Sequence, residues 1–335
     1  MRAELSVARI GKVLTKSMFS GYDLCINPYV GCEFGCSYCY VRFMVKDDKH
    51  DWGEFVRIRK HIKDRLPKEL DKANVKIENG HMLVNEPDKA KKKTIYKVLP
   101  ICESRLVLGT MTDPYQPAEK KHRITRETLE ILVSHTNQFK KVGIFTRSPL
   151  IMHDIELIKK LPKARVHFTV TPFQPHVLRA IEPYASITSR RWDTIKALKE
   201  AGIRVHVNVS PVIPFLSDGF EEEFVNKLID LQVDEYFCDP MQAYKESWIA
   251  FKRSIQNVDD VDSAKIEQMM CINDHNKDRY LDWKFEFYQK WNNIRKELQH
   301  KAPHQLPIWS DHENKVWVNM ITGEQMSKRV YGDEK

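Results

Sequence analysis

Three of the seven cysteines lie within eight residues of one another, in the segment GCEFGCSYCYVR at positions 31–42. Cys32, Cys36 and Cys39 follow the spacing C-x3-C-x2-C. In a reducing compartment, thiols this close together indicate a metal site or catalysis more readily than disulfides. The segment GCEFGCSYCY contains two glycines, a glutamate and a serine, so it does not resemble an apolar core strand.

A structural zinc site is the first alternative. Zinc in such sites usually has four protein ligands and no open position, and the ligands typically come from two well-separated pairs of residues. This sequence offers one triplet, and Cys25 or His50 would have to supply the fourth ligand. The spacing leaves zinc open but favours another metal centre.

An iron–sulfur cluster fits the triplet better. A [4Fe–4S] cluster usually has a cysteine on every iron. Three cysteines would leave one iron open, and a small molecule can chelate there. Gly31 and Gly35 would let the backbone fold tightly around such a cluster, because glycine adopts conformations that other residues avoid.

The segments that follow this loop alternate between strand-like and helix-like patterns. We expect strands at 22–27, 106–111, 141–146, 164–171, 204–213 and 234–239, and helices at 118–136, 151–161, 189–202 and 220–232. Strands that alternate with helices predict a parallel sheet. About six such units predict an α/β fold, with an open, partial (β/α)6 barrel rather than a closed eightfold barrel.

Two of these strands, RVHFTVT and RVHVNVS, alternate polar and apolar side chains, and successive side chains point to opposite faces of a strand. We expect the apolar face, which includes Val166 and Val205, to meet the outer helices. The inner face then carries His167, Thr169 and His206, and buried polar groups need hydrogen-bond partners. The lumen should therefore hold water or a polar ligand. A solvated antiparallel sheet is the alternative, but it fits the strand–helix alternation less well.

From about residue 245 the sequence becomes rich in tryptophan. We divide the chain into a barrel domain at 1–244 and an aromatic-rich α+β cap at 245–335, which contains helical and β-hairpin elements. Segment 315–326 predicts a strand and a turn at Thr322–Gly323. A helical stripe predicts core packing against the barrel, with base stacking as the alternative; its members are Tyr280, Phe287, Trp291, Ile294 and Leu298.

Composition indicates an ordinary globular protein, with 42% hydrophobic and 30% charged residues. No apolar run reaches the ~18 residues of a membrane span, and the N-terminus lacks a signal-peptide pattern. We therefore expect a cytoplasmic protein with no membrane partner. The net charge of +8 is compatible with a nucleic-acid partner but does not require one.

The cysteine spacing and several later phrases resemble the radical S-adenosylmethionine (SAM) superfamily, in particular its spore photoproduct lyase-like branch. The resemblance covers roughly residues 20–245. It implies a partial (β/α)6 barrel, in agreement with the strand pattern above. The phrases that carry it occur in the branch's order: NPYVGCEFGCSYCYVR, GTMTDPYQPAEK, IFTRSPLI, IEPYASITSRRWDTIKALKEAGI and VNVSPVIPFLSD.

The resemblance also implies a chemistry. Cys32, Cys36 and Cys39 would hold a [4Fe–4S] cluster, and SAM would chelate its open iron. Reductive cleavage of SAM would give a 5′-deoxyadenosyl radical that abstracts hydrogen from a substrate that the sequence does not identify. Nucleic acid is the favoured class, and a modified peptide and a small metabolite are the alternatives. The electron donor would be of the flavodoxin or ferredoxin type. The positions that match the branch's SAM contacts are Tyr38, Thr112, Asp113, Arg147, Thr169 and Ser210.

The residue chemistry is compatible with these SAM contacts. Asp113 follows a strand, where α/β sites gather ligands, and its carboxylate could pair with the SAM ammonium. Arg147 could bind the methionine carboxylate through two parallel hydrogen bonds. Thr169 and Ser210 lie on the polar strand faces and could bond ribose hydroxyls. The local alternatives are a turn shaped by Thr112 and Asp113, and a surface position for Arg147.

The chain departs from the branch in four places, one of which is the aromatic C-terminal cap, for which the branch has no counterpart. Thr110 occupies the position of a hydrogen-donating cysteine, and its O–H bond is too strong to replace a thiol, which argues against true spore photoproduct repair. Arg147 stands where the branch usually has lysine, which keeps the charge but changes its geometry. The segment 72–100 is longer than usual.

The alternative to an enzyme is a non-catalytic iron–sulfur or zinc module that binds nucleic acid.

Overall fold

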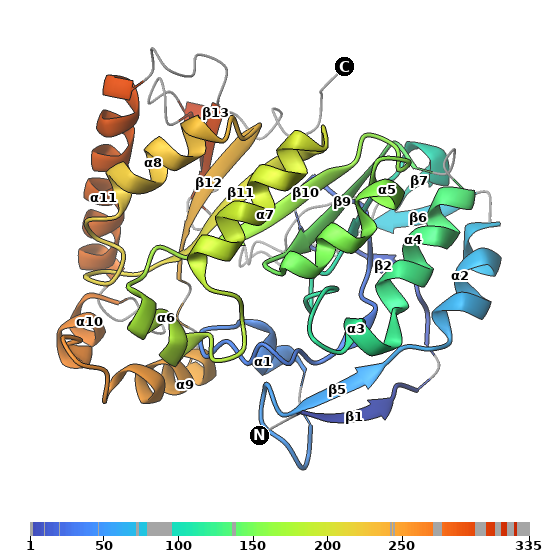
Figure 1. Ribbon diagram of the computed structural model, residues 1–335, viewed down its shortest axis with the longest axis horizontal. Helices are drawn as coiled ribbons and strands as arrows, with labels where there is room; N and C mark the ends of the chain where they lie inside the picture. The colour runs from blue at the N-terminus through green and yellow to red at the C-terminus, as the bar shows by residue number, and fades with distance from the viewer. Residues whose placement is uncertain are drawn as a thin grey trace, which may run out of the picture.

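The computed structural model describes residues 3–9, 11–19, 21–45, 47–71, 74–78, 96–135, 139–241, 243, 245–270, 277–298, 306–311, 316–319 and 325–326. A large sheet forms the centre of the molecule (Figure 1). Its strands are β2 (Thr15–Lys16), β3 (Leu24–Ile26), β8 (Arg105–Leu108), β9 (Lys141–Thr146), β10 (Arg165–Val170), β11 (Arg204–Val212), β12 (Glu235–Pro240), β13 (Leu306–Asp311), β14 (Val316–Asn319) and β15 (Gln325–Met326).

The order of the strands confirms the expected parallel sheet. Within the described residues it runs β15-β14-β13-β12-β11-β10-β9-β8-β3-β2. Neighbours from β3 to β13 are parallel, and β2, β14 and β15 pair antiparallel. Strands β3 and β8 to β12 match the six predicted strands to within three residues at each end. The α/β class and the barrel-like topology are therefore confirmed.

Helices α4, α5, α7 and α8 run along one face of the sheet (Figure 1). The helical segments between the strands are α3 (Glu119–His122), α4 (Ile124–Ser134), the 3-10 helix η3 (Pro149–Asp154), α5 (Ile155–Ile158), α6 (Pro175–Ile181), α7 (Thr188–Glu200) and α8 (Glu221–Asp230). The single helix expected at 118–136 is divided at Arg123, whose φ of 52° is left-handed. The Glu119 carboxylate accepts bonds from the backbone N–H groups of Thr125 and Arg126 at 3.0 Å, which caps the restarted helix.

The two faces of the central strands differ as the alternation predicted. Val166, Phe168 and Val205 are fully buried in the main apolar core, and α7 packs over β10 and β11. The opposite face carries His167 and His206, which are paired in register on neighbouring strands. One face of the sheet is thus a packed core and the other is a polar lumen.

The N-terminal part of the chain adds smaller elements beside this sheet. Strands β1 (Glu4–Val7), β4 (Tyr29–Val30) and β5 (Phe55–Ile58) form a separate sheet in the order β1-β5-β4. The long segment before β8 contains a β6–β7 hairpin. The remaining elements here are α1 (Val41–Met44), α2 (Ile62–Leu70), β6 (Asn74–Glu78), β7 (Tyr96–Pro100) and the 3-10 helix η1 (Ile101–Glu103).

The C-terminal part contains α9 (Lys245–Ile255), α10 (Ser263–Met269) and α11 (Lys277–Leu298) before β13. The predicted stripe on α11 packs into the core: Trp291 is fully buried, Phe287 and Tyr280 are nearly so, and α11 lies against α8. Base stacking on these rings is therefore excluded. The side chain of Leu298 and the turn expected at 322–323 lie outside the described residues. None of the described helices is long and apolar enough to span a membrane.

Candidate active site

The loop that carries the three cysteines is held in a tight backbone conformation. Gly31 and Gly35 have φ of +89° and +61°, in the left-handed region where a side chain is strained. A Cβ on Gly53 would lie 2.7 Å from the Cα of Gly35, so the two backbones pack directly on one another. The backbone is therefore tight at these glycines, and the expectation that it folds around a cluster stays a prediction.

The three thiols gather in one small cluster with Phe34 and Trp52. Cys32 and Cys36 are buried, Cys39 is half-buried, and none of the three forms a disulfide. Burial raises the pKa of Cys36 to about 12, and the neighbouring Cys39 adds to the shift. Burial also raises the pKa of Cys32, as do Asp113 and Cys36 nearby. Among the described residues, no three histidine, cysteine or acidic side chains stand in a ready-made metal-binding geometry.

Two polar residues from the segment that follows β8 hold the cysteine loop in place. Thr112 donates its hydroxyl to the carbonyl of Gly31 at 2.6 Å. Gln116 is fully buried, donates to the same carbonyl at 3.3 Å, and accepts from the N–H of Glu33 at 2.8 Å. The segment after β8 therefore fixes the position of the cysteine loop.

Asp113 joins the ends of β8 and β9. Its carboxylate accepts hydrogen bonds from the Thr146 hydroxyl at 2.7 Å and from the backbone N–H of Arg147 at 2.9 Å. The N–H of Tyr115 donates a third bond at 2.8 Å. Burial raises the pKa of Asp113, while these bonds oppose the shift. Asp113 thus has a structural role in addition to the expected pairing with the SAM ammonium.

A buried ionic network lies beside the cysteines. Arg147 donates to Glu182 at 2.6 Å and to the hydroxyl of Tyr38, which itself donates to Glu182. Arg191 is fully buried, pairs with the other oxygen of Glu182 and donates to Thr171 at 3.2 Å. Burial alone would raise the pKa of Glu182, but the two arginines outweigh it and lower the pKa to about 2. Two guanidinium groups share one carboxylate, so the network carries one excess positive charge.

Sequence reasoning identified Tyr38 and Arg147 but missed Glu182 and Arg191. Both residues fall within the phrase IEPYASITSRRWDTIKALKEAGI, which marked the segment 181–203 without assigning a role to its charged residues. The alternative of a surface position for Arg147 is wrong, because only 18% of its side chain is exposed.

Thr169 and Ser210 lie half-buried on the lumen face of β10 and β11. Asn208, which pairs with Thr169 in register, is buried, and its Oδ1 has no partner among the described residues. The Nε2 of buried His206 also lacks a partner, while its Nδ1 lies 3.2 Å from Glu235. Unpartnered buried polar atoms are costly, so these atoms indicate a lumen suited to a polar ligand or water.

The sequence-based candidates for a fourth metal ligand lie apart from the triplet. Cys25 belongs to a different apolar cluster, and its thiol is 3.1 Å from the Thr15 hydroxyl. The ring nitrogens of His50 face Asp47 at 3.0 Å and Glu4 at 3.2 Å. Neither residue completes a closed four-ligand site in this arrangement.

Thr110 stands at the end of β8, beside the cysteine loop. The Asn27 side-chain amide donates to its hydroxyl at 3.2 Å, and Tyr40 donates to its carbonyl. The hydroxyl is therefore engaged in a hydrogen bond that holds the strand ends together.

The family model for the Radical SAM superfamily matches residues 26–228, more than half of the chain. The chain belongs to the radical SAM superfamily. This radical SAM enzyme is also similar in structure to a spore photoproduct lyase mutant that was solved with dinucleoside spore photoproduct. The TM-score is 0.53 at 16% identity, with 78% of this chain and 68% of that chain covered. At that identity the likeness shows a shared fold.

Two curated relatives extend the comparison. An uncharacterised protein of Methanocaldococcus jannaschii is 27% identical over 277 residues, which cover 77% of this chain and 93% of the relative. An uncharacterised protein of Mycobacterium tuberculosis is 24% identical over 203 residues, which cover 58% of this chain and 51% of the relative. The radical SAM enzyme described here spans about half the length of the mycobacterial relative.

The donor set fits the cofactors that the superfamily implies, a [4Fe–4S] cluster and SAM. Cys32, Cys36 and Cys39 are neighbours without disulfides on one loop, and thiolates are the usual ligands of such clusters. An excess positive charge at Arg147 lies beside the cysteines, and the lumen contains unpartnered polar atoms. These are suitable groups for an anionic cluster and a polar ligand with a carboxylate.

Proposed function

We propose that this radical SAM enzyme binds a [4Fe–4S] cluster through Cys32, Cys36 and Cys39 and uses SAM to abstract hydrogen from a nucleic-acid substrate. One observation carries the proposal: three cysteines without disulfides lie on one tight loop at the carboxyl ends of parallel strands, beside a buried network with excess positive charge. When bound, the cluster and SAM supply reductive C–S cleavage and the 5′-deoxyadenosyl radical.

The six proposed SAM contacts divide into three pairs. Tyr38 and Arg147 belong to the ionic network, where a guanidinium can bind the methionine carboxylate. Thr169 and Ser210 face the lumen from β10 and β11 and suit ribose hydroxyls. Thr112 and Asp113 contribute chiefly by position, because they hold the loop and the end of β9.

The chain's own residues also exclude water from the cysteines. Phe34, Trp52 and Phe55 are buried around Cys32 and Cys36. Removal of water strengthens every charge interaction inside the site and protects reactive species from side reactions. A radical enzyme needs such a dry environment.

Nucleic acid is the proposed substrate class for two reasons. The net charge of +8 favours a polyanion, and the related spore photoproduct lyase fold has been solved with a dinucleoside ligand. Thr110 lacks a thiol, so the proposed reaction differs from one that returns hydrogen from a cysteine at that position. We assign the electron supply to a flavodoxin- or ferredoxin-type donor.

The test is anaerobic reconstitution followed by measurement of iron, sulfide and 5′-deoxyadenosine. Wild-type protein should bind about four irons and, with dithionite and SAM, release 5′-deoxyadenosine. Cys36→Ala should lose the product, whereas Cys102→Ser, at an exposed and remote thiol, should retain it. One zinc per chain without iron, or a fully loaded protein that leaves SAM intact, would refute the proposal and favour a non-catalytic module.

A further inference from the structure

A groove of ≈ 540 Å³ opens beside the cysteine loop, within the volume range of ordinary ligand sites, about 300–1,000 Å³. Its walls come from the segments that follow β8, β9 and α6 and from the loop itself. The groove therefore lies at the carboxyl edge of the sheet, where the active site is. The residues that matter here are Phe34, Lys120, His153, Tyr184, Ile187 and Arg190.

The groove and the cluster loop share a wall. Phe34 stands between Cys32 and Cys36 in the sequence and lines the groove. A Cβ on Gly35 would lie 3.8 Å from a ring carbon of Tyr184, so Tyr184 packs directly over the loop. A ligand in this groove would touch the loop that carries the cysteines.

The lining of the groove contains basic residues but no acidic ones. Its lining includes Lys120, His153 and Arg190, all exposed, and none of its residues is acidic. Within the described part of the chain, neither Lys120 nor Arg190 takes part in an ion pair. Two unpaired cations on the wall of one groove are complementary to an anion.

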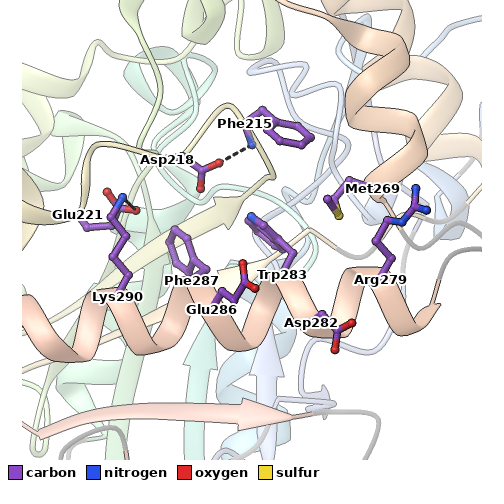
Figure 2. Close-up of a pocket in the computed structure, with 10 residues that line it drawn as sticks. All are labelled: Phe215, Asp218, Glu221, Met269, Arg279, Asp282, Trp283, Glu286, Phe287 and Lys290. Atoms are coloured by element: carbon purple, nitrogen blue, oxygen red, sulfur yellow. Dashed lines mark hydrogen bonds and ion pairs between the residues drawn. The ribbon is translucent and has the colours of Figure 1, made fainter.

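A second groove, of ≈ 460 Å³, lies against α11 and shows the contrast (Figure 2). There the charged side chains are mixed, and Lys290 is paired with Glu221 at 2.9 Å. Acidic residues outnumber basic ones around it: Asp218, Glu221, Asp282 and Glu286 against Arg279 and Lys290. A polyanion is therefore favoured at the first groove and disfavoured at this one.

The first groove also offers an exposed aromatic ring. Tyr184 is 51% exposed and Ile187 is 49% exposed, so both present apolar surface to a ligand. A positive groove with an aromatic face is the arrangement by which proteins bind single-stranded nucleic acid. A duplex keeps its bases stacked and would leave the ring unused.

We propose that this groove binds a single-stranded polynucleotide, with Lys120 and Arg190 on its phosphates and a base on Tyr184. The proposal rests on the proposed function, since it locates the nucleic-acid substrate of that same site. It places the strand along the cysteine loop, so that a neighbouring nucleotide can enter the lumen.

The test is fluorescence anisotropy with a fluorescein-labelled single strand of mixed sequence, about 12 nucleotides long, and the reconstituted full-length protein. Lys120→Ala/Arg190→Ala should weaken binding at least tenfold at low salt and reduce the salt slope by about 1.4, because each phosphate contact contributes about 0.7. Tyr184→Ala should weaken binding by about 5- to 150-fold and leave that slope unchanged. The matched control is Lys140→Ala/Lys160→Ala, which removes two exposed charges at the opposite edge of the sheet.

Binding that is absent in the wild type, or equal in the groove and control variants, would overturn the proposal. So would tighter binding of a duplex of the same sequence or of a poly-glutamate peptide. SAM cleavage by the wild type without nucleic acid tests the proposed function separately. If 5′-deoxyadenosine forms but the groove variants bind normally, only the groove assignment fails. If the groove variants lose binding and no 5′-deoxyadenosine forms, only the radical chemistry fails.

Discussion

Replacement of Glu182 by glutamine should destabilise the protein strongly, although the two side chains have nearly the same shape. The Glu182 side chain is fully buried and accepts hydrogen bonds from Tyr38, Arg147 and Arg191. Glutamine removes the negative charge and turns one acceptor into a donor that faces a guanidinium. Two buried cations would then share no counter-charge.

Two routes give a similar magnitude for this loss. The pKa of Glu182 falls from 4.5 to about 2, which corresponds to about 3 kcal/mol of stability. Removal of one partner from a buried ion pair typically costs about 3–5 kcal/mol. Because the folded-state pKa lies below the unfolded one, this contribution is complete above about pH 4.5 and is lost as the pH falls toward 2.

Urea denaturation of wild-type and Glu182→Gln protein at pH 7, with matched iron content, measures the difference. The control is Glu156→Gln, since that side chain is 80% exposed and pairs with Lys159 at 3.0 Å on the helix surface. Exposed pairs contribute about 0–1 kcal/mol, so the control should be nearly neutral. In the apoproteins, the Glu182 difference should also shrink at pH 3.5. A Glu182 variant as stable as the control at pH 7 would refute the assignment of a buried ionised carboxylate.

Three further predictions concern the sheet, the C-terminal helix and the metal. Gly143→Ala should lower the thermal midpoint, because its Cβ would lie 2.5 Å from Cζ of Tyr22. Such overpacking costs about 1–3 kcal/mol. Calorimetry would measure the shift, and an unchanged midpoint would contradict the geometry. Trp291→Ala should cost about 3–5 kcal/mol in urea denaturation, since the indole is fully buried, and a loss below 1 kcal/mol would mean that α11 does not pack as described. Removal of iron by chelation should lower the thermal midpoint of the wild type but not of Cys36→Ala, because a metal centre that binds only the folded state stabilises that state. Equal shifts in the two proteins would argue against Cys36 as a metal ligand.

The strands were predictable because the two faces of the sheet differ, with a packed core on one side and a polar lumen on the other, and alternation along a strand follows from that difference. Val166 and Val205 face the helices, and His167 and His206 face the lumen, as alternation requires. The division of the helix at Arg123 was not predictable, because an arginine in the left-handed region depends on the cap supplied by Glu119. The addition of β13 to the edge of β12 was also missed, since local pattern does not specify which edge a late strand joins.

The site was only partly predictable, for a related reason. The spacing of Cys32, Cys36 and Cys39 is a local feature and can be read directly from the sequence. The ion pairs of Glu182 depend on three segments that meet only in the folded chain, the ends of β9, α6 and α7. Charged residues are common in any sequence. A buried ion pair differs from a solvated one in its exclusion from water, which depends on the folded structure.

The cysteine loop is held from three sides by contacts that involve no metal. Thr112 and Gln116 bind its start, Ser37 donates its N–H to the carbonyl of Ile181 at 2.9 Å, and Tyr38 enters the ionic network. Contacts from the folded sheet therefore help to order the loop, which reduces the entropic cost of metal binding. The same loop links the proposed nucleic-acid groove to the site. A polynucleotide that contacts the groove wall also contacts the backbone between the cysteines. We therefore expect polynucleotide binding and the geometry of the metal site to be coupled.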